Sequence, residues 1–161
     1  MIAITWQKYS DIGSVGSTYA PGSKPSKSTC YMSIRAKWNE RYRAATGDRE
    51  ASRVLRENLH LLPENGRALD LACGLGGNAI LLAEQGLKVD AWDIADVPIA
   101  ALQAIVSDRH LPIEAKVRDV EVYPPVSETF DVIVVSYYLD RDIIPALITA
   151  VPLTFIAMPS G

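Results

Sequence analysis

The sequence predicts an α/β domain built on a doubly wound parallel sheet of about five strands. Short apolar runs alternate with amphipathic segments from residue 67 onward, which is the order that produces parallel strands joined by helices. Residues 132–135 are Val-Ile-Val-Val, a continuous apolar run typical of a strand buried on both faces. The chain has 161 residues, enough for one domain and too few for two of ordinary size.

The elements are expected in the following order. An N-terminal helical cap should comprise residues 34–45 and a second helix, 48–62, capped by Asp48 and stopped by Pro63 and Gly66. The strands are expected at residues 67–72, 87–93, 113–118, 130–136 and 153–158. The helices between and after them are expected at residues 76–85, 98–108 and 142–150.

Residues 9–33 are rich in Ser, Gly, Pro, Thr and Lys and have little apolar surface to bury. We interpret residues 1–33 as a flexible N-terminal tail preceding a domain of residues 34–161. The alternative is that translation has been taken to start too early.

Composition excludes some classes of function. The net charge is −3 and the 16 Lys and Arg residues form no dense run, which argues against binding driven by nucleic-acid phosphates but leaves a nucleic-acid substrate open. No stretch approaches the ~18 apolar residues of a membrane-spanning helix. Cys30 and Cys73 are too few and too badly placed for a disulfide framework, so a cytoplasmic location is expected.

The loop after the strand of residues 67–72 is the most informative segment. Gly74 and Gly76 allow close approach of a ligand to the backbone, and G-x-G-x-x-A also fits a dinucleotide-binding loop. Asp70 argues against that alternative, because a carboxylate would repel a pyrophosphate and would suit a cationic amino or sulfonium group. The competing interpretation of Asp70 is an acid that caps a helix or lies at the surface.

Asp93 lies 23 residues after Asp70, at the exit of the next strand. An acid there can accept hydrogen bonds from both hydroxyls of a ribose. Asp90 is the competitor, but the strand alternation places it inside the strand. A solvated loop acid is the simpler alternative for Asp93.

The pattern D-x-x-C-G-x-G-G at residues 70–77 resembles motif I of class I S-adenosylmethionine-dependent methyltransferases, which have a Rossmann-like fold. Residues 34–150 look like the small bacterial enzymes related to tellurite-resistance methyltransferases. Besides motif I, residues 37–43 (KWNERYR) and 136–142 (SYYLDRD) carry this resemblance.

The resemblance implies a set of residues that bind S-adenosylmethionine. Trp38 and Tyr42 would pack over the pocket, or simply dock their helix on the core, and Arg43 would reach the carboxylate of the methionine end. Asp119 would contact the adenine amino group with Val120 near the ring, unless Asp119 is an ordinary turn acid. The remaining cofactor-binding residues that it implies are Asp70, Ala72, Gly74, Gly76, Asn78, Asp93, Ile94, Ser136 and Tyr137. For Tyr137, simple packing is an equal alternative.

The chain also departs from the family pattern. It ends at Gly161, directly after the expected fifth strand, so the final antiparallel hairpin is expected to be missing. Residues 150–154 lack the usual basic-Pro-Gly-Gly-like turn, which suggests a truncation or a frame shift near Val151. The edge of residues 153–158 would then be bare, and a homodimer through it is expected.

The expected function is methyl transfer from S-adenosylmethionine to a small-molecule acceptor. No D/N-P-P-Y motif follows the strand of residues 130–136, which disfavours methylation of adenine or glutamine amino groups. No catalytic residue and no metal ligand is identified. The alternatives are a non-catalytic cofactor- or partner-binding remnant of a methyltransferase and, from the G-x-G-x-x-A pattern alone, a nicotinamide-dependent oxidoreductase.

Overall fold

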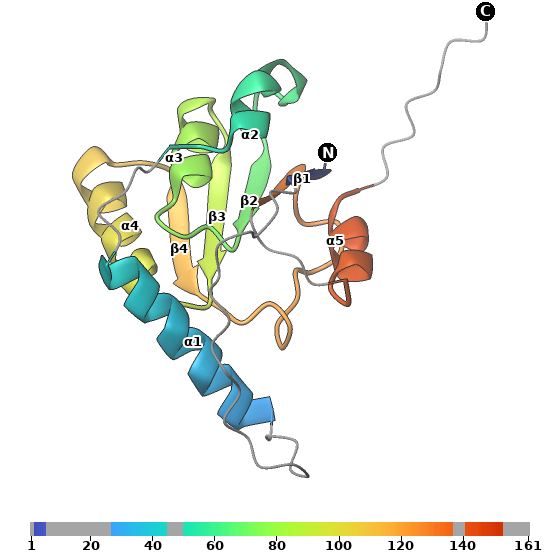
Figure 1. Cartoon of the computed structure of the whole chain (residues 1–161). Coiled ribbons are helices and arrows are strands. Elements are labelled where there is room, and N and C mark those ends of the chain that lie inside the picture. The colour runs from blue at the N-terminus through green and yellow to red at the C-terminus, as the bar shows by residue number, and fades with distance from the viewer. Residues whose placement is uncertain (1, 6–26, 45–49, 137–140, 153–161) are drawn as a thin grey trace, which may run out of the picture.

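The computed structural model describes residues 2–5, 27–44, 50–136 and 141–152 (Figure 1). Its strands are β1 (Ile2–Thr5), β2 (Arg67–Leu71), β3 (Lys88–Asp93), β4 (Ile113–Val117) and β5 (Val132–Ser136). Its helices are α1 (Lys27–Ala44), α2 (Arg53–Glu57), α3 (Gly77–Glu84), α4 (Asp96–Arg109) and α5 (Ile144–Ala150), with a 3₁₀ turn at Leu59–Leu61.

The strands form one sheet in the order β1-β5-β2-β3-β4, and every neighbouring pair is parallel. Its two faces bury separate apolar clusters. One cluster joins β2, β3 and β5 to α3 and α4 through residues such as Val89, Leu82 and Leu102. The other packs Leu147 of α5 against the opposite face, beside Phe130. The predicted doubly wound parallel sheet is therefore confirmed.

The structure differs from the expected tail of residues 1–33 at both ends of that segment. Residues 2–5 form β1, which pairs in parallel with β5, and α1 begins at Lys27 instead of residue 34. β1 pairs there because the side of β5 away from β2 has backbone N–H and C=O groups that need hydrogen-bond partners. The strand expected at residues 153–158 lies outside the described residues. In the described sheet, β5 has β2 on one side and β1 on the other.

The helix expected at residues 48–62 is shorter and broken. α2 begins after Ser52, whose hydroxyl accepts a hydrogen bond from Leu55 N at 3.4 Å, while Asp48 lies outside the described residues. α2 ends at Asn58, whose side chain donates to Val54 O at 2.8 Å. Such a local side-chain bond competes with the regular helix, which continues only as a 3₁₀ turn.

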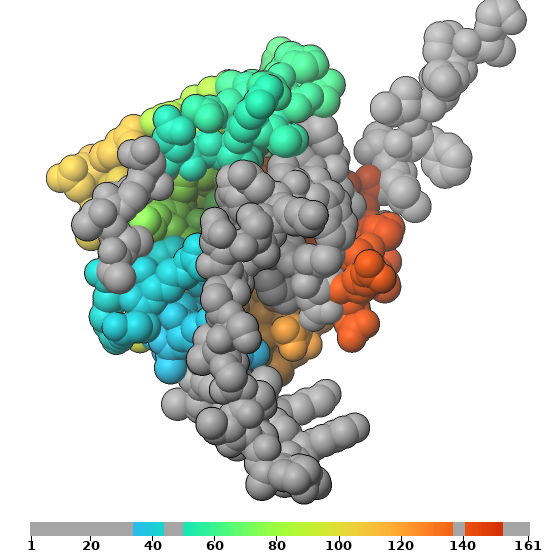
Figure 2. Space-filling model, viewed as in Figure 1, coloured from blue at the N-terminus to red at the C-terminus, as the bar shows by residue number. Residues whose placement is uncertain are grey.

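Helix α1 lies at the end of the sheet where β3 and β4 have their carboxyl ends (Figure 1). On the face shown in Figure 2, its surface (blue) and that of α5 (orange-red) lie on opposite sides of the molecule. None of the helices in the described ranges is long and apolar enough to cross a membrane.

Candidate functional site

The loop between β2 and α3 has an unusual backbone. Ala72, Gly74 and Gly76 all have positive φ angles, of 55°, 52° and 83°. A Cβ on Gly76 would lie 2.5 Å from Leu102 Cδ1, so the loop can approach α4 closely only with glycine there. The backbone of this loop is therefore tightly folded, and it lies over the carboxyl end of β2.

Asp70 lies beneath this loop with no exposed surface. Its Oδ2 accepts a hydrogen bond from Ala79 N at 3.0 Å, and its Oδ1 accepts one from Asn78 Nδ2 at 3.4 Å. Burial raises the pKa of its carboxyl to about 7, although both hydrogen bonds act in the opposite direction. Asp70 thus positions the first turn of α3, and direct contact with a ligand stays a prediction.

Asn78 connects the loop to two other segments. Its Oδ1 accepts the backbone N–H of Ser52 at 2.7 Å, and its Nδ2 donates to Ser136 Oγ at 3.1 Å. Asn78 and Ser136 are both buried, with 8% and 5% of their surface exposed. The structure therefore brings together two predicted site residues, one in the first turn of α3 and one at the end of β5, while Tyr137 lies outside the described residues.

Asp93 is held at the exit of β3 by two backbone groups. Its Oδ2 accepts Gly74 N, and its Oδ1 accepts Ala95 N, both at 2.8 Å. Burial raises the pKa of its carboxyl and the backbone hydrogen bonds lower it. The competitor, Asp90, is paired with Arg67 Nη2 at 2.9 Å, so the geometry favours Asp93 as the acid of the site. Ile94, next to it, is half-buried.

The segment after β4 is organised around Arg118. Its Cζ lies 4.0 Å from the centre of the Trp92 ring, and its Nε donates to Tyr123 O at 2.8 Å. Asp119 Oδ1 accepts Glu121 N at 2.9 Å, which is the geometry of a turn acid. Val120 is buried in the cluster that contains Trp92. The structure thus gives both predicted adenine contacts a local structural role, and their contact with a ligand stays a prediction.

Of the three predicted residues of α1, Tyr42 contacts the loop and Trp38 stacks on Tyr42. Trp38 and Tyr42 are half-buried and stack with ring centres 6.0 Å apart. A Cβ added to Gly74 would lie 2.6 Å from the hydroxyl oxygen of Tyr42, so the tyrosine is in direct contact with the loop. Arg43 is exposed and its Nη1 pairs with Glu40 at 3.3 Å. Its predicted contact with a methionine carboxylate is thus untested.

Ser52 and Asn39 hold neighbouring segments of the candidate site together, and neither was predicted from the sequence. Ser52 carried a usable signal, because serine is as good an N-cap as aspartate. Asn39 carried none, since its partners at the start of α4 are 57 and 58 residues away in the chain. Among the described residues, no cluster of three or more His, Cys, Asp and Glu could hold a metal ion.

Comparison with known proteins gives one family and three curated relatives, two of which are TehB from different strains of Haemophilus influenzae. The family model described as "Tellurite resistance protein TehB" matches residues 38–155. The chain is 38% identical over 74 residues to the putative methyltransferase YqeM of Bacillus subtilis, covering 46% of this chain and 30% of YqeM. It is 32% identical over 85 residues to a probable S-adenosyl-L-methionine-dependent methyltransferase TehB of Haemophilus influenzae, covering 51% of this chain and 29% of that protein. The matched part thus spans less than a third of either relative.

The crystal structure of TehB from Haemophilus influenzae has a similar fold. Its TM-score is 0.53 at 23% identity, and the match covers 72% of this chain and 40% of that one. At this identity the likeness bears on the fold, and it agrees with the parallel sheet and flanking helices described above.

Proposed function

Because the chain belongs to the family of the tellurite resistance protein TehB, we propose that it binds S-adenosylmethionine and transfers the methyl group to a small-molecule acceptor. YqeM and TehB are both named as methyltransferases, which supports this proposal. Because the chain spans only part of these relatives, the residues of the chain itself must also support the proposal.

The observation that carries the proposal is the contact between Gly74 and Asp93. Gly74 N donates to Asp93 Oδ2, so the glycine loop after β2 and the acid after β3 form one unit. The two carboxylate oxygens of Asp93 accept backbone N–H groups from the loop and from the residues after β3, and a carboxylate has about four lone-pair sites, which leaves capacity for a ribose hydroxyl. The side chain of Tyr42 already occupies the space beside Gly74, as expected of a cap over a bound nucleoside.

The charges beneath the loop favour a cation. Asp70 and Asp93 are both buried there, and Asp93 is close enough to raise the pKa of the Asp70 carboxyl. The negative charge of Asp93, and that of Asp70 above about pH 7, would attract a sulfonium and repel the pyrophosphate of a nicotinamide dinucleotide. This favours the methyltransferase over the oxidoreductase alternative.

The chain's contribution to methyl transfer would be binding and orientation. The bound cofactor supplies a methyl group activated by a positively charged sulfur. Asp93 would fix the ribose, and Tyr42 with Trp38 would cover the nucleoside, so that an acceptor meets the methyl group in line with the breaking C–S bond. A thiol or chalcogen anion needs no general base for this step, and we assign none.

Titration calorimetry of the purified chain with S-adenosylmethionine, S-adenosylhomocysteine and NADH tests the proposal. We expect micromolar binding of both adenosyl compounds and none of NADH. The control is Glu114→Gln, which removes an exposed acid of β4 and should bind as the unmodified chain does. Release of S-adenosylhomocysteine with thiol and chalcogen oxyanion acceptors then tests transfer. Binding without transfer to any acceptor would favour the non-catalytic remnant, and binding of NADH alone would contradict the proposal.

We further propose that the protein acts in the cytoplasm, without nucleic acid as a partner. The buried free thiol of Cys73 and the net charge of −3 support this. A homodimer through residues 153–158 also stays a proposal, because those residues lie outside the described part of the chain. Light scattering would measure the mass of the particle in solution and decide between monomer and dimer.

A further inference from the structure

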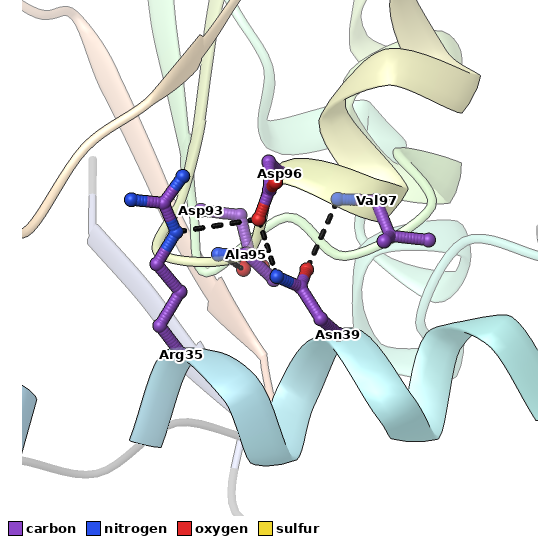
Figure 3. Close-up of polar contacts among 6 residues, drawn as sticks. All are labelled: Arg35, Asn39, Asp93, Ala95, Asp96 and Val97. Atoms are coloured by element: carbon purple, nitrogen blue, oxygen red, sulfur yellow. Dashed lines mark hydrogen bonds and ion pairs between the residues drawn. The ribbon is translucent and has the colours of Figure 1, made fainter. Parts of the chain in front are cut away.

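Asn39 connects α1 to the start of α4 (Figure 3). Its Nδ2 donates to Asp96 Oδ1, and its Oδ1 accepts the backbone N–H of Val97 at 3.1 Å. Asn39 is 8% exposed, and it is the one buried side chain among residues 34–43 of α1. Both ends of its amide are therefore engaged with the first turn of another helix.

This contact supplies a cap that α4 lacks in its own sequence. The N-cap residue of α4 is Ala95, which has no side chain able to accept a hydrogen bond. Asn39 accepts the free N–H of Val97 in its place. Arg35, one turn earlier on α1, adds a contact from its Nε to Asp96 Oδ1 at 3.2 Å. The hydrogen bond from Asn39 holds the pKa of Asp96 below its ordinary value, with smaller contributions from a backbone hydrogen bond of Asp96 and from the hydrogen bond and charge of Arg35.

The segment that Asn39 holds also carries the acid of the site. Asp93 is three residues before Asp96, and its Oδ1 accepts the N–H of Ala95 at 2.8 Å (Figure 3). One turn further along α1, Tyr42 contacts Gly74, whose N–H is bound to the same Asp93. Helix α1 is therefore attached at one point to the segment after β3 and touches the loop after β2 at another.

We infer that Asn39 is a positioning residue, which fixes α1 over residues 72–76 and thereby sets how slowly a bound adenosyl compound leaves. The inference rests on the proposed function, since it concerns the same site. Asn39 acts through α1 and Tyr42 and makes no contact with the ligand itself. Loss of the contact should therefore raise the dissociation rate more than it lowers the association rate.

The test is an exchange of donor and acceptor between Asn39 and Asp96. Asn39→Asp sets a carboxylate against the carboxylate of Asp96 and removes the donor. We expect it to raise the dissociation rate of S-adenosylhomocysteine about tenfold, the effect of roughly 1.4 kcal/mol. The double variant Asn39→Asp/Asp96→Asn restores one donor and one acceptor and should return the rate to within about threefold of the unmodified chain.

Surface plasmon resonance measures the rates, and amide hydrogen exchange of residues 34–43 without ligand measures how firmly α1 is docked. Exchange should rise in Asn39→Asp and fall again in the double variant. Lys37→Gln is the control, because Lys37 is exposed on the same helix and is not among the predicted site residues, and it should change neither measurement.

Three results would overturn the inference. The first is an unchanged dissociation rate in Asn39→Asp, and the second is a rate that the double variant does not restore. The third is a fall in melting temperature that accounts for the whole effect, which would make Asn39 a residue of general stability. If the unmodified chain binds no adenosyl compound, the proposed function fails, while hydrogen exchange still reports whether Asn39 holds α1.

Discussion

Replacement of Asp70 by asparagine is expected to change how the stability of the protein depends on pH. Burial raises the pKa of the Asp70 carboxyl from 3.8 to about 7 in the folded protein. Between these two values the folded state keeps a proton that the unfolded chain has lost. The free energy of unfolding contributed by this group is therefore full below the lower value and falls as pH rises to the upper one.

The size of the effect follows from the two pKa values. At 1.36 kcal/mol per pKa unit, the rise from 3.8 to about 7 corresponds to about 4 kcal/mol. Asp70 has no exposed surface, so solvent screening does not reduce this figure greatly. Asp70→Asn keeps one acceptor for the N–H of Ala79 and has no charge to bury, so its own cost does not vary with pH.

Urea unfolding followed by circular dichroism between about pH 4 and pH 8 measures the difference. We expect the stability of Asp70→Asn relative to the unmodified chain to improve by about 4 kcal/mol over this range and to level off above neutral pH. Glu114→Gln, which removes an exposed acid, is the control and should give a flat difference. Parallel curves for Asp70→Asn and the unmodified chain would refute the reasoning.

Three further outcomes are expected around the same loop. Asp93→Ala should weaken binding of S-adenosylmethionine by about 1–3 kcal/mol in calorimetry, the value of a hydrogen bond to a charged group, and unchanged affinity would mean that the ribose is bound elsewhere. Gly74→Ala should weaken the binding of S-adenosylmethionine about tenfold or more while the fold persists, because a Cβ there would lie 2.6 Å from the hydroxyl of Tyr42. Wild-type affinity in this variant would show that Tyr42 does not cap the site. Gly76→Ala should lower the free energy of unfolding by about 1–3 kcal/mol, because its φ is 83° and its Cβ would meet Leu102, and an unchanged urea midpoint would contradict this.

Much of the fold could be predicted because its signals are local. The apolar run of residues 132–135 forms the core of β5, and the predicted strands and helices from residue 67 to residue 150 each have a counterpart in the structure. Gly86 directly follows the helix expected at residues 76–85, and its φ of 94° is the left-handed conformation in which a glycine typically ends a helix. Periodicity and backbone preference act over a few neighbouring residues, so they can be read without knowing the packing.

Inside the helices, burial was harder to predict than position. For the helix expected at residues 142–150, the apolar periodicity predicts an inward face of Ile143, Ile144, Leu147 and Ile148. Ile143 and Leu147 are buried, but Ile148 is 51% exposed. An apolar residue on a short helix is buried only where another element covers it, and that depends on the neighbouring elements.

The sequence by itself determined the fold class of the protein and the place of its candidate site. A glycine loop after one strand and an acid after the next come to the same edge of any parallel sheet, so Gly74 and Asp93 could be expected there. Only the tertiary structure decided which atoms meet. The bonds from Asn78 to Ser52 and from Asn39 to Val97 join residues 26 and 58 positions apart, and β1 pairs with a strand from the far end of the chain. Such pairings depend on how whole elements pack, since every buried N–H needs an acceptor and only the packed molecule determines which acceptor lies within reach.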